Sequence, residues 1–346
     1  MALKMLNCAS ASLGCSVKAC YRSVTKNAPG IAKFFMKAQI SISVIIPLPD
    51  HRGIAVEAIK NWREKQTYPQ NNFEIIVVSD GSEPSLEAEI QSYLKHQDSL
   101  LRKPGENIPS LTNFAAEKAL GDLLFITEAH CLPKADCLTH ITQYFDENEV
   151  DVACCSSDGI NQNLLAQMEQ RIFDEDFVKR SKSDAWNKIT VRGFGIKRSV
   201  FLDAGGFDSS YGHFSEPVLG AHLHYLGYRM GCASEAKVSH YNNFNLKYLI
   251  PSLIEYGEDE IRYRIDGNQD YCRQYFHSST AWEQRKASSL INLRHKLKNL
   301  LIIELSKIQL FIEQKNPEKY FHIYKRLWRH AIEYGHYQAI NKYLKT

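Results

Sequence analysis

The sequence predicts an α/β protein of the Rossmann-like type, in which a mostly parallel sheet carries helices on both faces. Strand-like and helix-like segments alternate from residue 41 to about residue 245, as in a series of βαβ units. The strand-like runs are continuously apolar, which is typical of strands buried on both faces. Beyond residue 245 the alternation stops and long helical patterns follow. We therefore expect an α/β domain over residues 41–245 and a C-terminal helical region over residues 246–346.

The first half of the α/β domain contains three predicted strands. The run SISVIIPLP is β-branched and is stopped by prolines, FEIIVVSDGS ends in a turn-forming Asp-Gly-Ser, and GDLLFITEAH ends in polar residues. Apolar residues at helical spacing lie between these runs. The predicted strands are within residues 41–49, 73–82 and 121–130, and the predicted helices within 55–66, 85–96 and 110–120.

The second half continues with a predicted helix at CLTHITQYF and a strand at VDVACCSS. Residues 161–185 are polar and helix-prone, and we expect them to form a flap or an insertion beside the acceptor of a reaction. The stretch TVRGFGIKRSVFLDAGGFD predicts a strand, a short helix over residues 198–204 and a Gly-Gly turn. A helix at VLGAHLHYLGYRM precedes a last strand that ends at His240.

Composition excludes some classes of protein. No apolar run approaches the roughly 18 residues that a membrane-spanning helix needs. Residues 1–40 hold six Lys or Arg and no acidic residue, and residues 281–346 hold thirteen basic and five acidic residues. The basic N-terminal segment fits either a disordered extension or an organellar transit peptide. Nine cysteines without a C-x-x-C pair fit a reducing compartment, so we expect a cytoplasmic protein.

Polar residues follow three of the predicted strands directly. Asp50 follows the first strand, Asp80 ends the second, and Glu128 and His130 end the third. Ligands of open α/β sheets bind beyond the carboxyl ends of the strands. The convergence of these side chains at one edge of the sheet is therefore the first indication of a functional site.

The order of these motifs resembles that of family 2 nucleotide-sugar glycosyltransferases with the GT-A fold, over about residues 41–265. SVIIPLPD resembles the opening strand and nucleotide loop, EIIVVSDGS the second strand, and ALGDLLFITEAHCLP the segment with the metal-binding Asp-x-Asp. GFGIKRSVFLDAGGFD resembles the stretch before the catalytic helix, and SHYNN a strand ending in His. The chain departs from the family by having Glu128-Ala129-His130 in place of Asp-x-Asp.

The sequence EAHC is similar to the Asp-x-His motif of the polypeptide N-acetylgalactosaminyltransferases. This resemblance implies a divalent metal held by His130 and His240, with Glu128 as a direct ligand, as a ligand through water or as a contact to the donor ribose. Imidazole and carboxylate suit Mn²⁺ better than Mg²⁺, which prefers oxygen ligands, although Mg²⁺ stays an alternative. A metal bridging two phosphates stabilises the charge of a nucleoside diphosphate leaving group.

The resemblance also implies a donor site and a base. Residues expected to contact the nucleotide sugar are Pro47, Leu48, Asp50, Asp80, Asn113, Glu128 and Gly195. Counting back from Gly227-Tyr228 places Glu216 where inverting members carry their catalytic Asp, and Pro217 fits the start of a helix. Glu216 could instead only favour the helix dipole. Since Asp-x-His relatives retain configuration, the stereochemistry stays open.

These features predict a metal-dependent hexosyl- or N-acetylhexosaminyltransferase that uses a nucleotide-diphosphate sugar, with UDP as the expected nucleotide. The expected acceptor is a hydroxyl of a glycan, a lipid-linked molecule or a protein, as in the synthesis of cell-surface glycans, and no nucleic acid is expected. Two rivals are a catalytically silent nucleotide-sugar-binding or scaffold protein and a nucleotidyltransferase, although PLPDHRG is a poor triphosphate loop.

The C-terminal region contains a helical stripe of apolar residues with Lys and Arg opposite. Its members are Leu290, Leu293, Leu297, Leu301, Leu305 and Ile308. Such a helix would either pack on the body of the protein or make peripheral contact with an anionic membrane at its cytoplasmic face.

Overall fold

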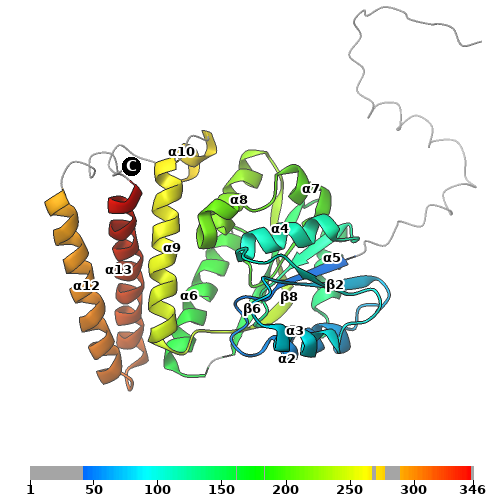
Figure 1. Cartoon of the computed structure of the whole chain (residues 1–346), viewed down its shortest axis with the longest axis horizontal. Coiled ribbons are helices and arrows are strands. Elements are labelled where there is room, and N and C mark those ends of the chain that lie inside the picture. The colour runs from blue at the N-terminus through cyan, green and yellow to red at the C-terminus, as the bar shows by residue number, and fades with distance from the viewer. Residues whose placement is uncertain (1–41, 161, 183, 267–269, 277–288, 344–346) are drawn as a thin grey trace, which may run out of the picture. The chain divides into compact units, whose positions relative to one another are not determined.

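The computed structural model describes residues 42–343, except residues 161, 183, 267–269 and 277–288 (Figure 1). The basic segment over residues 1–40 therefore lies outside the described residues. Within the described part, an α/β portion is followed by long helices, as the sequence predicts.

One sheet of eight strands forms the centre of the α/β portion, in the order β3-β2-β1-β4-β7-β6-β8-β5. The strands are β1 (Ile42–Pro47), β2 (Phe73–Ser79), β3 (Ser99–Arg102), β4 (Leu123–Ile126), β5 (Cys131–Pro133), β6 (Val152–Ile160), β7 (Phe194–Lys197) and β8 (Met230–Tyr241). Neighbours from β3 to β4 are parallel, as are β6 and β8, whereas β7 is antiparallel to both of its neighbours and β5 is antiparallel to β8. The mostly parallel sheet that the sequence predicts is confirmed.

The strands β3 and β5 were not expected from the sequence. β3 is a four-residue edge strand, and β5 has only three residues and ends in a proline. Both lie at the edges of the sheet, where a strand can be short because it has one neighbour. Neither carries enough residues to produce a hydrophobic pattern.

Helices cover the sheet on both faces. One apolar core joins α2, α3 and α5 to one face through Trp62, Ile90 and Ile141. A second core joins α4, α7 and α8 to the other face through Leu111, Phe201 and Leu223. These helices are α2 (Ala55–Glu64), α3 (Pro84–Gln91), α4 (Ile108–Lys118), α5 (Cys137–Glu147), α7 (Arg198–Asp203) and α8 (Ser215–Tyr225). Val44 and Ile45 of β1 face opposite cores, which explains why that strand is apolar at every position but one.

The segment over residues 161–185, expected as a flap or insertion, contains the helix α6 (Leu164–Ser181), which packs beside β6. The helices that follow β8 are α9 (Leu246–Asp266), α10 (Asp270–Phe276), α12 (Ser289–Ile312) and α13 (Pro317–Tyr343). In Figure 1, α13 lies between α9 and α12. A third core contains side chains of α6, α9, α12 and α13. No helix among the described residues is long and apolar enough to cross a membrane.

The helices α9 and α13 approach closely at a pair of glycines. A Cβ on Gly257 of α9 would overlap the backbone of Ile332, and a Cβ on Gly335 of α13 would overlap the backbone of Ile254. Because the obstructing atoms are backbone atoms, a larger side chain at either position would push the two helices apart.

We expect Gly257→Ala to lower the free energy of unfolding by about 2 kcal/mol, although alanine is the better helix former. Thermal unfolding measures the effect, with Ser252→Ala on the exposed surface of the same helix as the matched control. A Gly257→Ala protein as stable as the control would show that α9 and α13 do not touch at this point.

Candidate active site

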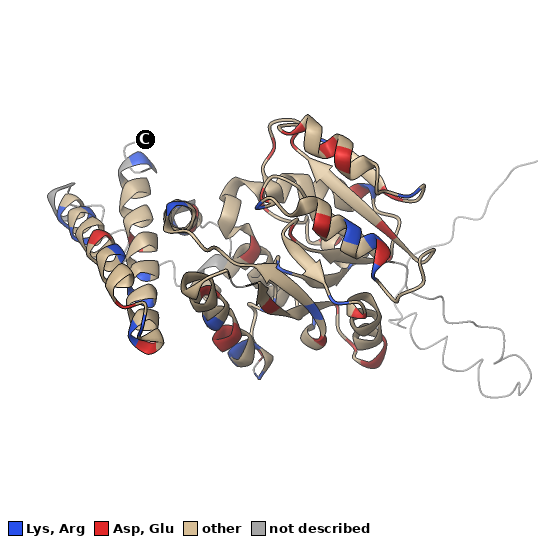
Figure 2. Cartoon of the chain, turned by 90° about the horizontal axis from the view of Figure 1, so that it is seen from below, with Lys and Arg blue, Asp and Glu red and all other residues tan. Residues whose placement is uncertain are grey.

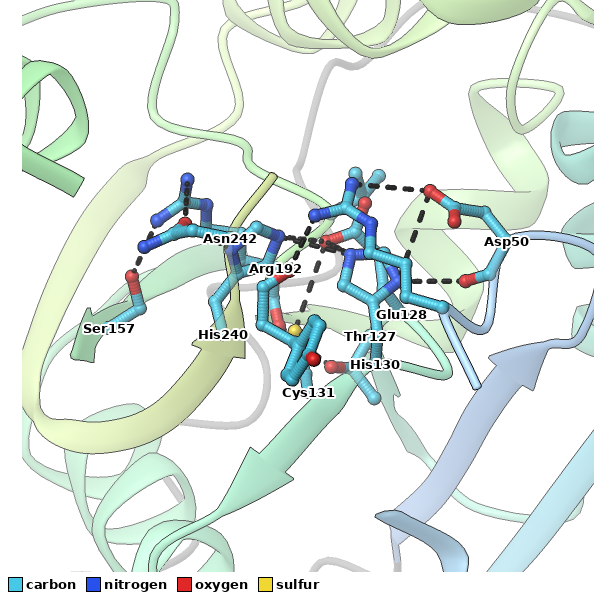
Figure 3. A network of polar contacts seen from close by, with 12 residues as sticks. Asp50, Thr127, Glu128, His130, Cys131, Ser157, Arg192, His240 and Asn242 are labelled. Atoms are coloured by element: carbon cyan, nitrogen blue, oxygen red, sulfur yellow. Dashed lines mark hydrogen bonds and ion pairs between the residues drawn. The ribbon is translucent and has the colours of Figure 1, made fainter. Parts of the chain in front are cut away.

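Strand pairing brings Glu128, His130 and His240 together (Figure 3). Thr127, which follows β4, donates its backbone N–H to Ile45 of β1 at 3.1 Å. The chain then turns and enters β5, where Cys131 lies opposite His240 of the antiparallel strand β8. Glu128 and His130 belong to this turn, so the pairing of β5 with β8 places both of them beside His240.

Three potential ligand atoms face one another in this cluster. The Nε2 atoms of His130 and His240 are 3.1 Å apart. The Oε2 atom of Glu128 lies 3.3 Å from Nε2 of His240 and 3.5 Å from Nε2 of His130. Both imidazoles are buried, whereas Glu128 is partly exposed toward the cavities described below.

The other ring nitrogen of His130 fixes which nitrogen carries its proton. Nδ1 lies 2.7 Å from the backbone carbonyl oxygen of Asp50, which can only accept a hydrogen bond. Nδ1 therefore holds the proton and Nε2 carries a lone pair. Burial lowers the pKa of His130 to about 4, so the ring is neutral at physiological pH.

A chain of amides fixes the proton on His240 in the same way. Its Nδ1 lies 2.6 Å from Oδ1 of Asn242, and Arg192 donates to that same oxygen at 3.2 Å. The amide group of Asn242 donates in turn to Oε1 of Gln170 at 3.2 Å. Nδ1 of His240 is therefore a donor, and its Nε2 also carries a lone pair. Burial and the nearby Arg192 keep the pKa of His240 well below its usual value.

The Nε2 atoms of His130 and His240 and the Oε2 atom of Glu128 are thus all hydrogen-bond acceptors, and none of the three can donate a hydrogen bond to another. Such a group repels itself unless a cation lies between its members. Neutral imidazoles oriented by a second hydrogen bond are the form in which histidine binds metals. The residues present therefore fit a divalent transition ion such as Mn²⁺.

Two neighbours complete the surroundings of this cluster. The thiol of Cys131 points to Oε2 of Glu128 at 3.8 Å, and Cys131 also groups with Glu128 and His240 as a possible ligand. Burial and Glu128 raise the pKa of the Cys131 thiol, so it stays protonated and is a weaker ligand than the imidazoles. The guanidinium of Arg52 pairs with Asp50 at 3.3 Å and donates to the carbonyl of Tyr241 at 2.5 Å, which connects the loop after β1 to the end of β8.

Two cavities meet at this cluster. The first has a volume of about 410 Å³ and is lined by residues after β1 and β4, by the start of α4, by the loop before α8 and by α9. The second, of about 460 Å³, is lined by α6, α9 and α13 and by His240. Four residues line both cavities and so form a shared wall: Glu128, Val191, His213 and Glu216.

Glu216 lies in the first turn of α8, in the wall that the two cavities share. Its Oε2 accepts the backbone N–H of Val191 at 3.0 Å. Burial raises the pKa of Glu216 to about 7, although the N–H of Val191 and the charge of Arg180 act in the opposite direction. A carboxyl group with this pKa can take up and release a proton near neutral pH.

His213 is the second ionisable group in the shared wall. Its Nε2 lies 3.5 Å from a carboxylate oxygen of Glu255 on α9. This interaction raises the pKa of His213, with the charge of Asp259 acting in the same direction. A positive charge is therefore favoured beside the metal-ligand cluster.

The other residues predicted for the donor site are placed differently. Pro47 and Asp50 line the first cavity, but Leu48 is buried behind it. Asp80 accepts from the N–H and hydroxyl of Ser82 and so caps its own turn. Asn113 exchanges hydrogen bonds with the backbone of Phe207 at 2.8 and 2.9 Å.

Gly195 faces the core instead of a cavity. A Cβ there would lie 3.0 Å from side-chain atoms of Ile141 and Phe145 on α5. Leu48, Asp80, Asn113 and Gly195 line neither of the two cavities, so their predicted contacts with a nucleotide sugar find no support in their positions.

Sequence reasoning missed the residues that orient the cluster, above all Asn242, Arg192 and Arg52. Asn242 stands two positions after His240, so an amide directly following the strand was an available signal. Arg192 is buried in an ion pair with Glu169 at 3.3 Å, a long-range contact that no local pattern indicates.

Comparisons with known proteins agree with the fold. Residues 43–203 match the sequence profile described as Glycosyl transferase family 2. A mannosyltransferase from Pyrobaculum calidifontis, solved with GDP-Man and Mn²⁺, superposes with a TM-score of 0.57 at 15% identity over 86% of this chain and 88% of that one. S. aureus TarS 1–349, solved with UDP-GlcNAc, superposes with a TM-score of 0.51 at 15% identity over 88% and 92% of the two chains. No curated protein matches the sequence significantly.

The facing lone pairs lead to a two-sided prediction for Glu128→Gln. A carboxamide can donate a hydrogen bond to either Nε2. Without metal, the free energy of unfolding of the variant should therefore be about 1 kcal/mol higher than that of the wild type. The same change removes an anionic ligand, so the variant should lose most of the stabilisation that Mn²⁺ gives the wild type.

Thermal unfolding with chelator and with MnCl₂ measures both effects. Glu235→Gln, an exposed position on β8, is the matched control and should leave both values unchanged. A metal-free Glu128→Gln protein that is less stable than wild type would contradict the assignment of the lone pairs.

Proposed function

We propose that the chain, whose residues 43–203 match the Glycosyl transferase family 2 profile, transfers a sugar from a nucleotide-diphosphate sugar, with UDP as the nucleotide, to a hydroxyl group. The observation that carries this proposal is the position of Glu216, whose carboxyl group lines both cavities beside the metal-ligand cluster. A transferase that inverts the configuration needs such a group between its two substrates.

The donor would occupy the first cavity. Its walls contain Pro47, Asp50 and the start of α4, at the carboxyl ends of β1 and β4 where ligands of open α/β sheets bind. Glu128 and His213 lie in the wall toward the second cavity, where the diphosphate would approach the cluster. The positive charge favoured on His213 suits an anionic diphosphate leaving group.

Glu128, His130 and His240 would hold the metal, with Mn²⁺ as the ion that their chemistry favours. When bound, the ion supplies positive charge that stabilises the diphosphate as it leaves. Asp50, Asn242 and Arg192 would serve this site by holding the two imidazoles in the neutral form and the required orientation.

Glu216 would act as the general base. It takes the proton from the acceptor hydroxyl, the oxygen forms a bond to the anomeric carbon, and the bond from that carbon to the diphosphate breaks with its electron pair on the leaving oxygen. Burial of Glu216 makes it a stronger base than an exposed carboxylate, since its pKa is about 7.

The acceptor would bind in the second cavity, whose walls combine aromatic rings with one cation. Phe173, Tyr256 and Trp328 come from three different helices and could stack against a sugar ring. Arg180 lies in the same wall, and among the described residues no carboxylate forms an ion pair with it. A hexose or N-acetylhexosamine acceptor in a glycan or on a lipid fits these walls.

The second candidate function is binding of a nucleotide sugar without catalysis. The replacement of Asp-x-Asp by Glu128-Ala129-His130 motivates it, because an altered metal motif is one route to a silent relative. Release of free sugar from a panel of UDP- and GDP-sugars in the presence of Mn²⁺ distinguishes the two candidates. If a donor raises the thermal stability but is never cleaved with any metal, the silent candidate holds.

Glu216→Gln should lower kcat for donor hydrolysis or transfer by about 10²–10⁴-fold, since the amide cannot accept the proton. The variant should keep the stabilisation by UDP and Mn²⁺, because Glu216 is not among the metal ligands. Glu235→Gln should leave the rate unchanged. A Glu216→Gln enzyme with the kcat of the wild type would show that Glu216 is not the general base.

The wild-type rate should also depend on pH in a defined direction. A carboxyl group with a pKa of about 7 is protonated and inactive as a base below that value, so log kcat/KM should rise with pH and level off above about pH 7. The groups facing Glu216 are the N–H of Val191 and the charges of Arg180, Arg192 and Glu128. Arg180→Gln should shift the midpoint upward, because it removes a cation that favours the ionised form. A midpoint near pH 4 would contradict the burial effect.

A further inference from the structure

Most of the apolar side chains of helix α12 point away from the rest of the protein, which is unusual for a helix that only packs on its own chain. It is the outermost of the C-terminal helices in both views of the chain (Figures 1 and 2), and its main neighbour is α13. Of the two alternatives that the sequence leaves open for this stripe, packing on the body does not fit the structure, because the described members of the stripe are exposed. Of its members, Leu290 has no described side chain.

The exposed face is large, and it is apolar except for Glu304, which helical spacing places among the apolar side chains. Its apolar side chains are between 39% and 77% exposed. They are Leu293, Leu297, Leu300, Leu301, Leu305, Ile308, Phe311 and Ile312. At 3.6 residues per turn these positions share one side of the helix along its whole length. We call this set the α12 face.

The opposite, buried side of α12 is the more polar one. The buried residues there include Asn292, Asn299 and Ser306, together with Ile303 and Leu310. Asn299 accepts a hydrogen bond from His330 of α13 at 2.8 Å, and Ser306 accepts one from Arg326 at 3.3 Å. A helix that buries amides and exposes leucines presents its hydrophobic side as a surface for binding a partner outside its own chain.

The charges beside the α12 face indicate what that partner is. Between Ser289 and Ile312 the helix carries four Lys or Arg and one acidic residue. Arg294 and Lys298 fall at one edge of the face, and Lys296 and Lys307 at the other. The acidic residue, Glu304, is neutralised by Lys307 at 2.6 Å.

These charges argue against a second copy of the chain and against residues 1–40 as the partner of the α12 face. They favour an anionic lipid surface. Two copies of a helix with a net charge of +3 would repel each other, and residues 1–40, with six cations and no anion, would be repelled as well. An anionic lipid surface is attracted by the cations and accepts the leucines. Lysine and arginine at the edges of an apolar face can extend to lipid headgroups while their stems cover hydrocarbon.

We propose that α12 is a reversible membrane-binding helix that lies in the headgroup region of an anionic bilayer, with its α12 face toward the acyl chains. The helix is not apolar enough to span a bilayer, which agrees with this surface position. The consequence is that the chain is held at the surface of a membrane. This proposal stands independently of the proposed transfer reaction, because it rests on α12 alone.

Co-sedimentation of the full chain with vesicles tests the proposal. We expect binding to phosphatidylcholine vesicles that contain phosphatidylglycerol, much weaker binding to phosphatidylcholine alone, and loss of the difference at high salt. Leu297→Glu/Leu301→Glu should lower the partition coefficient by at least about tenfold. Lys296→Gln/Lys298→Gln should weaken binding to the anionic vesicles by roughly fivefold for each cation.

The matched control is Leu120→Glu/Leu202→Glu, which makes the same chemical change at exposed leucines of the α/β domain and should bind like wild type. Phe311→Trp gives a second readout, since its fluorescence should shift to the blue on anionic vesicles only. Equal binding to both kinds of vesicle, or binding to neither, would overturn the proposal. Self-association that Leu297→Glu/Leu301→Glu abolishes, without vesicle binding, would assign the α12 face to a second copy of the chain.

Discussion

The antiparallel pairing of β5 with β8 is the contact on which the site depends. The strand β5 has only three residues, and its pairing with β8 places Cys131 opposite His240. The turn just before β5, which contains Glu128 and His130, is thereby held beside His240. Two hydrogen bonds, one to the carbonyl of Asp50 and one to the amide of Asn242, then force both imidazoles to present unprotonated nitrogens to each other. The local fold therefore creates an electrostatic demand that a divalent cation can satisfy.

The C-terminal helices belong to this site as well as to the helical region. Asp259 of α9 accepts the backbone N–H of His213 at 2.9 Å, and it lies so close to Gly212 that a Cβ there would overlap its carboxylate. Gly212 has a φ of 42°, which glycine adopts without strain. Since His213 and Glu216 follow directly, α9 fixes the loop and the start of α8 that separate the two cavities. Both cavities are lined by residues from both sides of position 245.

The sequence alone predicted the features that repeat or that stand beside a strong local pattern. Continuous apolar runs such as Ile42–Pro47 predicted a sheet buried on both faces. The resemblance of EAHC to a known metal motif predicted that Glu128, His130 and His240 come together. The sequence could not predict β5, which is too short for a period, or Arg192, whose partners come from residues far away in the chain. Periodicity also could not indicate which side of α12 faces outward, because a stripe has the same spacing whether it is covered or exposed.

The central claim is that the Nε2 atoms of His130 and His240 and the carboxylate of Glu128 bind one divalent cation. Anomalous diffraction at the manganese edge, from crystals grown with MnCl₂ and UDP, tests it most directly. We expect one strong peak bonded to both Nε2 atoms and to Glu128. A structure with no anomalous peak there, in which the two Nε2 atoms stay within hydrogen-bond distance of each other, would contradict it.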